Sequence, residues 1–301
     1  MSGKGGGKGK KGSRSGSARS TRRRSGSRSD GRGQRGTTPT RPERSSRHPL
    51  GGDQVEGRQA VRELLLAGRR RAGEVVISAE VDPAPILDDI IDLADEQKVT
   101  IREVSRARFE SLTRTESAQG VFATAAPLEP VDIDDLLVPE GGVAPFLLLL
   151  DGVTDPGNLG AVLRTAEGAG VTGVVLPRHR AAHVTPTVAK TAAGAVEHLR
   201  IAVVSGLPAA MKKLAGQGVW TVGLDAGGAT SLYELAIADE PLGLVLGAEG
   251  AGLSRLVRQR CDVVASIPLD GVLGSLNVAA AAAVSCFEIA RRRAGAGAGS
   301  H

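Results

Sequence analysis

Hydrophobic residues follow alternating helical and strand patterns in two long stretches of the chain, and the first stretch lies between residues 57 and 125. Apolar residues recur there at helical spacing, and short runs rich in Val and Ile are typical of strands. The predicted helices cover residues 57 to 68, 85 to 94 and 105 to 112, and the predicted strands cover residues 74 to 78, 99 to 104 and 120 to 125. This alternation predicts a small α/β layer domain.

The second stretch begins at residue 146, and its strand candidates are apolar on both faces. They cover residues 146 to 150, 173 to 176, 199 to 204, 219 to 224, 242 to 246 and 263 to 267. Helices predicted at residues 208 to 215 and 276 to 293 lie between and after them. Such strands are typical of a parallel sheet covered by helices on both faces. Ligands of these sheets bind at the carboxyl ends of the strands.

The remaining segments show neither pattern. Residues 127 to 145 contain four prolines and an acidic cluster, which predicts a linker with one helical turn around residues 134 to 137. We therefore expect a tail at residues 1 to 50, a first domain at 51 to 126, a second domain at 146 to 294 and a disordered end at 295 to 301.

The amino-terminal tail is strongly basic. Residues 1 to 48 hold 15 Lys and Arg against Asp30 and Glu43, so the tail carries +13 and the rest of the chain −8, which together give the net charge of +5. Without apolar periodicity it is expected to be disordered. An arm of this charge is expected to bind the phosphate backbone of RNA without recognising its bases. A solubilising tail, or one that binds anionic surfaces in general, is the alternative.

Other features narrow the class of protein. Cys261 and Cys286 lie in apolar stretches and cannot form a zinc site by themselves, so we expect buried free thiols in a reducing compartment and no metal. No apolar run approaches the roughly 20 residues that span a bilayer, and the amino terminus has no hydrophobic secretion region. A soluble cytoplasmic protein is expected.

Three turns carry the candidate chemistry, and each follows a predicted strand. After the first strand of the second domain, Asn158 offers an amide and Arg164 a guanidinium suited to phosphate. The alternative is that Asn158 caps a helix and Arg164 forms a surface ion pair. The turn after residue 246 is rich in glycine and holds one acid, Glu249, which can accept hydrogen bonds or act as a base; the alternative is a carboxylate at a helix amino terminus.

The third turn presents Ser275 and Asn277 at the start of an alanine-rich helix, where Ser275 is a natural cap. Its neighbourhood lacks the Gly-x-Ser-x-Gly elbow of serine hydrolases. The glycines of the second turn do not match the dinucleotide fingerprint, and the chain has no phosphate-loop lysine motif.

Taken together, residues 151 to 166, 246 to 254 and 267 to 279 resemble the three motifs of the SpoU (TrmH-type) RNA ribose 2'-O-methyltransferases. Residues 55 to 126 resemble, more loosely, the ribosomal-protein-like substrate domain of the RlmB-type members. The chain departs from the family pattern at Leu269, where methionine is usual, and at Ala118, where histidine is common.

The resemblance implies a catalytic domain of the SPOUT class with a deep trefoil knot, which binds S-adenosylmethionine. It also implies a homodimer in which Arg164 of one chain acts beside the cofactor of the other. The catalytic residues that it implies are Asn158, Arg164, Glu249, Ser275 and Asn277. The cofactor-binding residues that it implies are Leu224, Leu246, Gly247, Gly250, Ile267, Leu269 and Leu276.

The function implied by the resemblance is 2'-O-methylation of a ribose, on a guanosine, in the 23S RNA of the large ribosomal subunit. The same reaction on transfer RNA and an antibiotic-resistance ribosomal RNA methyltransferase are alternatives within this enzyme class. A non-catalytic RNA-binding ribosome-assembly protein is the alternative from another class. The intact set from Asn158 to Asn277 argues against the last.

Overall fold

The computed structural model describes residues 50–115, 118–139, 142–179, 181–272 and 274–298. Residues 1 to 49 of the expected basic tail lie outside the described residues. Leu50 is described, and it forms an antiparallel bridge with Leu128. No helix within these ranges is long and apolar enough to cross a membrane.

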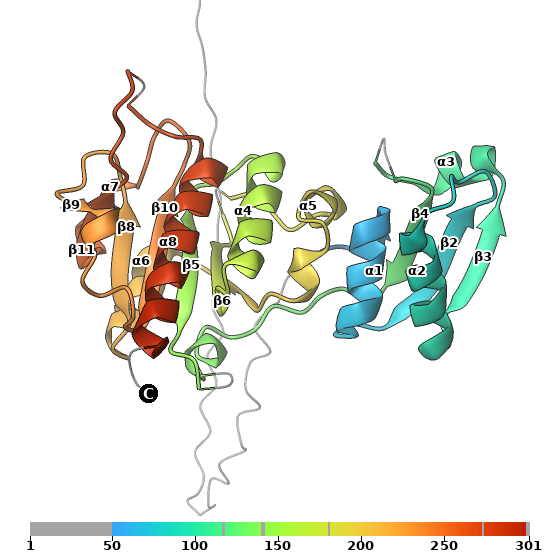
Figure 1. Ribbon diagram of the computed structural model, residues 1–301, viewed down its shortest axis with the longest axis horizontal. Coiled ribbons are helices and arrows are strands. Elements are labelled where there is room, and N and C mark those ends of the chain that lie inside the picture. The colour runs from blue at the N-terminus through green and yellow to red at the C-terminus, as the bar shows by residue number, and fades with distance from the viewer. Residues whose placement is uncertain (1–49, 116–117, 140–141, 180, 273, 299–301) are drawn as a thin grey trace, which may run out of the picture. The chain divides into compact units, whose positions relative to one another are not determined.

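Residues 54 to 125 form a four-stranded mixed sheet. Figure 1 labels its strands β2, β3 and β4. Its strands are β1 (Gln54–Glu56), β2 (Ala72–Ser78), β3 (Thr100–Val104) and β4 (Val121–Ala125), in the order β1-β4-β2-β3. β2 and β3 are parallel, and β4 is antiparallel to both of its neighbours. The helices are α1 (Arg58–Ala67), α2 (Pro85–Glu96) and α3 (Arg106–Leu112).

Alternation along β2 explains why helices cover both faces of this sheet. Val75 packs among the buried residues of α1 and α2, whereas its neighbour Val76 packs against Phe109 of α3 on the other face. All three predicted helices and all three predicted strands are present. β1 was not predicted, because three residues are too short to show a period.

Residues 146 to 266 form a seven-stranded sheet in which every strand pair is parallel. Its strands are β5 (Phe146–Asp151), β6 (Gly173–Pro177), β7 (Ile201–Val204), β8 (Trp220–Leu224), β9 (Thr230–Ser231), β10 (Leu242–Gly247) and β11 (Val263–Ser266). Their order across the sheet is β7-β6-β5-β10-β8-β11-β9. The prediction of an α/β protein with a small first domain and a parallel, SPOUT-like second domain is therefore confirmed.

Helices cover both faces of the large sheet, as its apolar strands require. Leu148 and Leu150 of β5 pack with buried residues of three helices, and Leu147 and Leu149 pack on the opposite face. The first face carries α4 (Pro156–Gly168), α5 (Pro186–Thr191) and α8 (Val278–Ala298), and the second carries α6 (Leu207–Ala215) and α7 (Arg255–Arg260). The helix α8 reaches Ala298, although a disordered end was expected from residue 295.

The segment expected to be a linker packs against the large sheet. It contains the predicted helical turn, the 3-10 helix η1 (Asp135–Leu137), and Leu136 is 1% exposed. A Cβ atom on Gly173 of β6 would lie 2.7 Å from Leu136 Cδ2, so glycine makes room for this side chain. Val131 also forms a parallel bridge with Ala202. These contacts hold residues 131 to 137 against β6 and β7.

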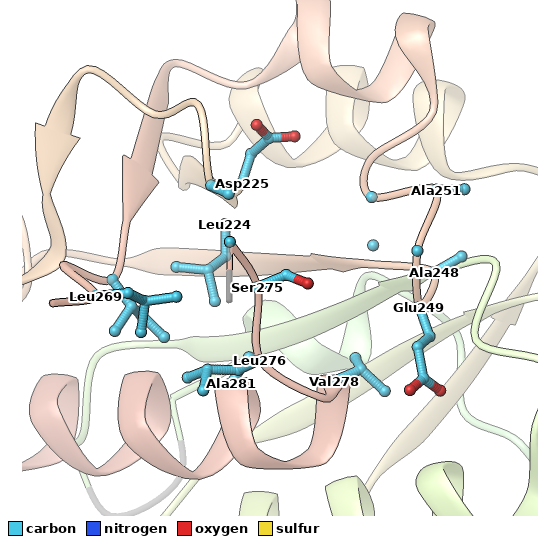
Figure 2. Close-up of a pocket in the computed structure, with 16 residues that line it drawn as sticks. Leu224, Asp225, Ala248, Glu249, Ala251, Leu269, Ser275, Leu276, Val278 and Ala281 are labelled. Atoms are coloured by element: carbon cyan, nitrogen blue, oxygen red, sulfur yellow. The ribbon is translucent and has the colours of Figure 1, made fainter. Parts of the chain in front are cut away.

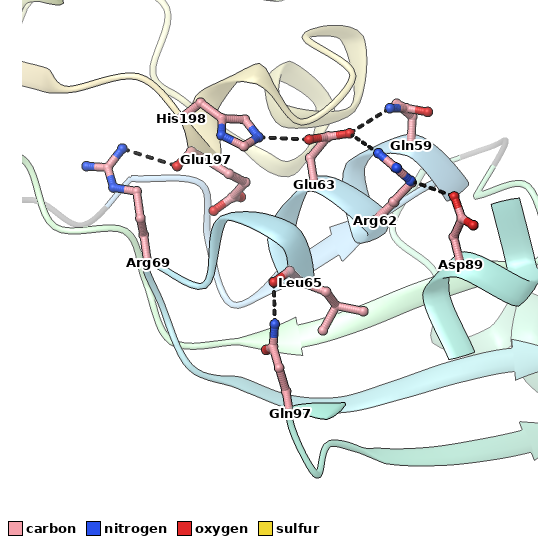
Figure 3. Close-up of polar contacts among 9 residues, drawn as sticks. All are labelled: Gln59, Arg62, Glu63, Leu65, Arg69, Asp89, Gln97, Glu197 and His198. Carbon is pink, nitrogen blue, oxygen red and sulfur yellow. Dashed lines mark hydrogen bonds and ion pairs between the residues drawn. The ribbon is translucent and has the colours of Figure 1, made fainter. Parts of the chain in front are cut away.

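Polar contacts join the end of α1 to the 3-10 helix η2 (Ala195–Glu197) and the residues after it. Arg70 donates to both carboxylate oxygens of Glu197, at 3.0 and 2.6 Å, and both side chains are almost fully buried. Figure 3 shows the neighbouring contacts, in which Glu63 lies 2.8 Å from the ring of His198 and Arg69 donates to the carbonyl oxygen of Glu197. Removing one partner of the buried ion pair would be costly, because it would leave the other charge buried alone.

Candidate active site

A pocket of about 260 Å³ lies at the carboxyl ends of β8, β10 and β11, beside the start of α8. Figure 2 shows the residues around it. Backbone groups and apolar or small side chains make up most of its lining. The lining residues are Leu224, Asp225, Ala226, Gly247, Ala248, Glu249, Gly250, Ala251, Gly252, Ile267, Leu269, Gly274, Ser275, Leu276, Val278 and Ala281. This is the position at which open parallel sheets bind ligands.

The turn after β10 forms one wall of the pocket, and only glycine fits two of its positions. Ala248 and Gly252 exchange backbone hydrogen bonds of 3.0 and 2.8 Å, which close the turn. A Cβ atom on Gly247 would lie 2.2 Å from the carbonyl carbon of Gly252, so any other residue would force the turn open. Gly250 has a φ of 76°, which favours glycine.

Asn158, Glu249 and Asn277 meet beside this pocket, although they come from three different turns. The Asn158 amide donates to Glu249 Oε2 at 3.0 Å. The Asn277 amide donates to Asn158 Oδ1 at 3.0 Å and lies 3.4 Å from Glu249 Oε1. Both oxygens of the Glu249 carboxylate are thus held by neutral amide donors. Its charge has no cationic partner among the described residues, and it faces the solvent side of the pocket.

The alternatives of simple helix capping are wrong for Asn158 and Glu249. The cap of α4 is Asp155, whose Oδ1 accepts the Asn158 backbone N–H at 2.6 Å. Glu249 lies in the turn itself, several residues before α7 begins after its cap position Ser254. Asp151 also accepts the Ser254 backbone N–H at 2.7 Å, which ties the first turn to the second.

The cap of α8 differs from the one expected. Asn277 Oδ1 accepts the backbone N–H of Ala279 at 2.8 Å, and the helix begins at Val278. Ser275 lies two residues too early to cap this helix, so that prediction is wrong. Its side chain lines the pocket instead, as Figure 2 shows. The sequence predicted that both residues lie near the start of this helix, but it did not show which of them caps it.

Arg164 lies apart from the other candidate catalytic residues. Six residues of α4 separate it from Asn158, which corresponds to about 9 Å along the axis and about 120° around it. The exposed Arg164 guanidinium forms no hydrogen bond or ion pair within the described part of the chain. It borders a second hollow of about 690 Å³, which Gln119 and Lys190 also line.

Six of the seven expected cofactor-binding residues line the pocket, and Leu246 does not. Leu246 is 1% exposed and packs in the core beneath the sheet end. Leu269, which replaces the usual methionine, lines the pocket with its apolar side chain. Ala118, which replaces the common histidine, is 5% exposed and packs with Phe109 and Phe122, so it faces the interior of the first domain.

The sequence motifs missed one charged residue of the lining, Asp225, which follows β8. An acidic residue directly after an apolar strand is the signal that could have identified it.

The two cysteines have no role in this pocket. Both are free thiols, and burial raises the pKa of Cys261 to about 11 and that of Cys286 to about 12. Such thiols are protonated and unreactive at neutral pH. No group of three or more His, Cys, Asp or Glu side chains that could hold a metal occurs among the residues described.

Comparison with known proteins gives two family matches. Residues 145–287 match the SpoU rRNA Methylase family, and residues 54–131 match a family described as RNA 2'-O ribose methyltransferase substrate binding. A Bacillus subtilis protein, named as belonging to the TrmH family of tRNA/rRNA methyltransferases, is 37% identical over 243 residues, which cover 80% of this chain and 96% of that protein.

Solved structures have the same fold. A protein of Porphyromonas gingivalis, described as an RNA methyltransferase of the TrmH family, matches with a TM-score of 0.63 and 31% identity over 80% of this chain and 90% of that chain. The SpoU methyltransferase AviRb from Streptomyces viridochromogenes, in complex with AdoMet, matches with a TM-score of 0.67 and 24% identity over the same shares of the two chains. The chain therefore belongs to the SpoU (TrmH) family of S-adenosylmethionine-dependent RNA ribose 2'-O-methyltransferases.

Proposed function

We propose that this protein methylates the ribose 2'-hydroxyl of a guanosine in the 23S RNA of the large ribosomal subunit, as an RlmB-like member of its family. The observation that carries the proposal is the meeting of Asn158, Glu249 and Asn277 at the rim of the pocket after β10. Residues 54–131 match a substrate-binding domain. Ribosomal RNA is favoured over transfer RNA because this part of the sequence resembles the ribosomal-protein-like domain of the RlmB-type members.

The pocket suits S-adenosylmethionine. Gly247 and Gly250 expose backbone groups that can bind polar edges of an adenosine, and Ile267, Leu269 and Leu276 offer apolar surface to its base. When bound, this cofactor supplies an electrophilic methyl group on a positively charged sulfur. Glu249 and Asp225 are the charged side chains of the described lining, and their negative sign suits a cationic ligand. A trefoil knot in this part of the chain is part of the proposal.

Arg164 would act on the RNA rather than on the cofactor. A ribose hydroxyl must lose its proton as its oxygen forms the new bond to the methyl carbon. A guanidinium stays protonated and is a poor base, so Arg164 would bind the phosphate next to the target ribose and stabilise the developing alkoxide. The proton would then pass to an oxygen of that phosphate. Asn158, Glu249, Ser275 and Asn277 would hold the ribose and the cofactor turns in position.

The separation of Arg164 from the other residues favours a site built from two chains. Arg164 lies about 120° around α4 from Asn158, and it lines a hollow together with Gln119 of the first domain. In a homodimer, Arg164 of one protomer would lie beside the cofactor of its partner. The hollow on the Arg164 side would receive the RNA, and the basic arm at residues 1 to 48 would add sequence-independent attraction in the cytoplasm.

The substrate can be identified by mapping 2'-O-methyl groups in ribosomal and transfer RNA from cells with and without this gene. We expect one ribosomal position to lose its methyl group when the gene is deleted, and to regain it with the wild-type gene. Loss at a transfer RNA position instead would contradict the choice of ribosomal RNA. Unchanged maps for both RNAs would contradict the proposed function and favour a ribosome-assembly protein.

A further inference from the structure

Asp225 is held in a fixed position at the carboxyl end of β8, in the wall of the pocket. Its backbone N–H donates to the carbonyl oxygen of Ala265 in β11 at 2.9 Å. Its side-chain Oδ1 accepts the backbone N–H of Gly227 at 2.9 Å, which closes a tight turn. The side chain is 23% exposed. A carboxylate fixed in this way is oriented before any ligand binds.

The two oxygens of this carboxylate differ in their surroundings. Arg258 Nη2 lies 3.6 Å from Oδ1 and also donates to the carbonyl oxygen of Gly227 at 3.2 Å. The other oxygen, Oδ2, accepts no hydrogen bond from a described residue. A Cβ atom on Gly252 would lie 3.4 Å from Oδ2, so this oxygen lies close to the glycine turn after β10. Figure 2 shows the Asp225 and Glu249 carboxylates on opposite sides of the lining.

The charge environment indicates which donors Asp225 would accept. Arg258 lies beside Oδ1 of Asp225, whereas the donors to Glu249 are neutral amides. A carboxylate that has a guanidinium beside one oxygen and no donor on the other suits a hydroxyl donor at the second oxygen. Carboxylates that follow a parallel strand bind ribose hydroxyls in the same way in dinucleotide-binding sheets.

We propose that Asp225 binds the ribose hydroxyls of the adenosyl cofactor and thereby selects a ribonucleoside in this pocket. This inference rests on the proposed use of the pocket by S-adenosylmethionine. It assigns Asp225 to cofactor recognition and leaves Glu249 on the side of the methyl acceptor.

The test is a binding cycle measured by calorimetry with S-adenosylhomocysteine and its 2'-deoxy and 3'-deoxy analogues. For the wild type, removing the hydroxyl that Asp225 contacts should weaken binding on the order of tenfold or more, as expected for a hydrogen bond to a charged group. Asp225→Ala should weaken binding of S-adenosylhomocysteine by a similar factor. This variant should bind the deoxy analogue that lacks the contacted hydroxyl as tightly as it binds S-adenosylhomocysteine. Asp92→Ala, an exposed carboxylate on α2, is the matched control and should behave as wild type.

Asp225→Asn covers the possibility that the alanine variant loses the turn, because the asparagine oxygen can still accept the Gly227 N–H. It should show the same direction of change with a smaller factor. Equal losses from both deoxy analogues in wild type and both variants would overturn the proposal. A variant with lower affinity for S-adenosylmethionine but unchanged affinity for S-adenosylhomocysteine would also overturn it, since that pattern indicates a contact with the sulfonium. A wild type that binds neither ligand would contradict the proposed function itself.

Discussion

At the scale of single residues, this site depends on amides that hold a carboxylate. Glu249 accepts from Asn158 and lies near the Asn277 amide, so its two oxygens are fixed without a cation. This leaves a negative group at the rim of a pocket that is otherwise mostly apolar or backbone. Arg164, the one cation among the candidate catalytic residues, stays outside this cluster in the same chain.

Arg164→Ala should reduce methyl transfer on the order of a hundredfold or more, as for other groups that stabilise developing negative charge. Its affinity for S-adenosylmethionine should stay within a few-fold of wild type, because Arg164 does not line the cofactor pocket. Radiolabel transfer and calorimetry measure the two quantities. Arg106→Ala, which alters an exposed ion pair on α3, is the control. Equal loss of binding and transfer would show that Arg164 acts on the cofactor.

At the scale of elements, the glycine turn after β10 shapes the cofactor pocket. Gly247→Val should remove measurable S-adenosylmethionine binding, because its Cβ would lie 2.2 Å from the Gly252 carbonyl carbon and displace the turn. Gly206→Ala is the control, since its Cβ would meet only Pro208 Cδ at 4.0 Å. Thermal melts of both variants should still show cooperative unfolding. Wild-type affinity in Gly247→Val would contradict this account of the turn.

The buried pair of Arg70 and Glu197 gives a prediction about stability. Glu197→Ala should lower the free energy of unfolding by about 3–5 kcal/mol, because it leaves the Arg70 guanidinium buried without its partner. Glu74→Ala, which removes the exposed pair with Arg102, should cost less than about 1 kcal/mol. Urea unfolding measures both. Similar costs for the two variants would show that burial does not determine the contribution of these ion pairs.

The sequence predicted the long apolar elements well and the short ones poorly. The strand predicted at residues 242 to 246 is β10 (Leu242–Gly247), and the helix predicted at 57 to 68 is α1 (Arg58–Ala67). β1 and β9 were missed, because two or three residues show no period and pair only through their neighbours β4 and β11. The strand order was not predicted either, since periodicity carries no information on which strands pair.

The candidate site was predicted in part, for a related reason. Motif residues from loops at the strand ends lie at or beside the pocket, because all carboxyl ends of a parallel sheet lie at one edge. Leu246 is the exception, because alternation along β10 turns it into the core. The resemblance put Arg164 beside the cofactor of a second chain, and within its own chain Arg164 borders the second hollow and not the pocket.

At the scale of the whole molecule, the account requires two chains for each active site. An equal mixture of Arg164→Ala and Asn277→Ala protein, allowed to exchange subunits, should form mixed dimers in half of the molecules, each with one intact site. Activity should then rise from near zero to about a quarter of wild type. A mixture that stays inactive while exchange is shown by native mass spectrometry would place Arg164 and Asn277 in the site of one chain.

The central claim is methyl transfer to a ribose oxygen of RNA, and it has a direct test. The purified protein is incubated with ribosomal RNA from cells that lack the gene and with S-adenosylmethionine that carries a deuterated methyl group. The RNA is then digested to nucleosides, which are analysed by mass spectrometry. We expect the labelled methyl group on the ribose of one nucleoside, with the label from Arg164→Ala lower on the order of a hundredfold or more. A labelled base, or no transfer by wild-type protein that binds the cofactor, would contradict it.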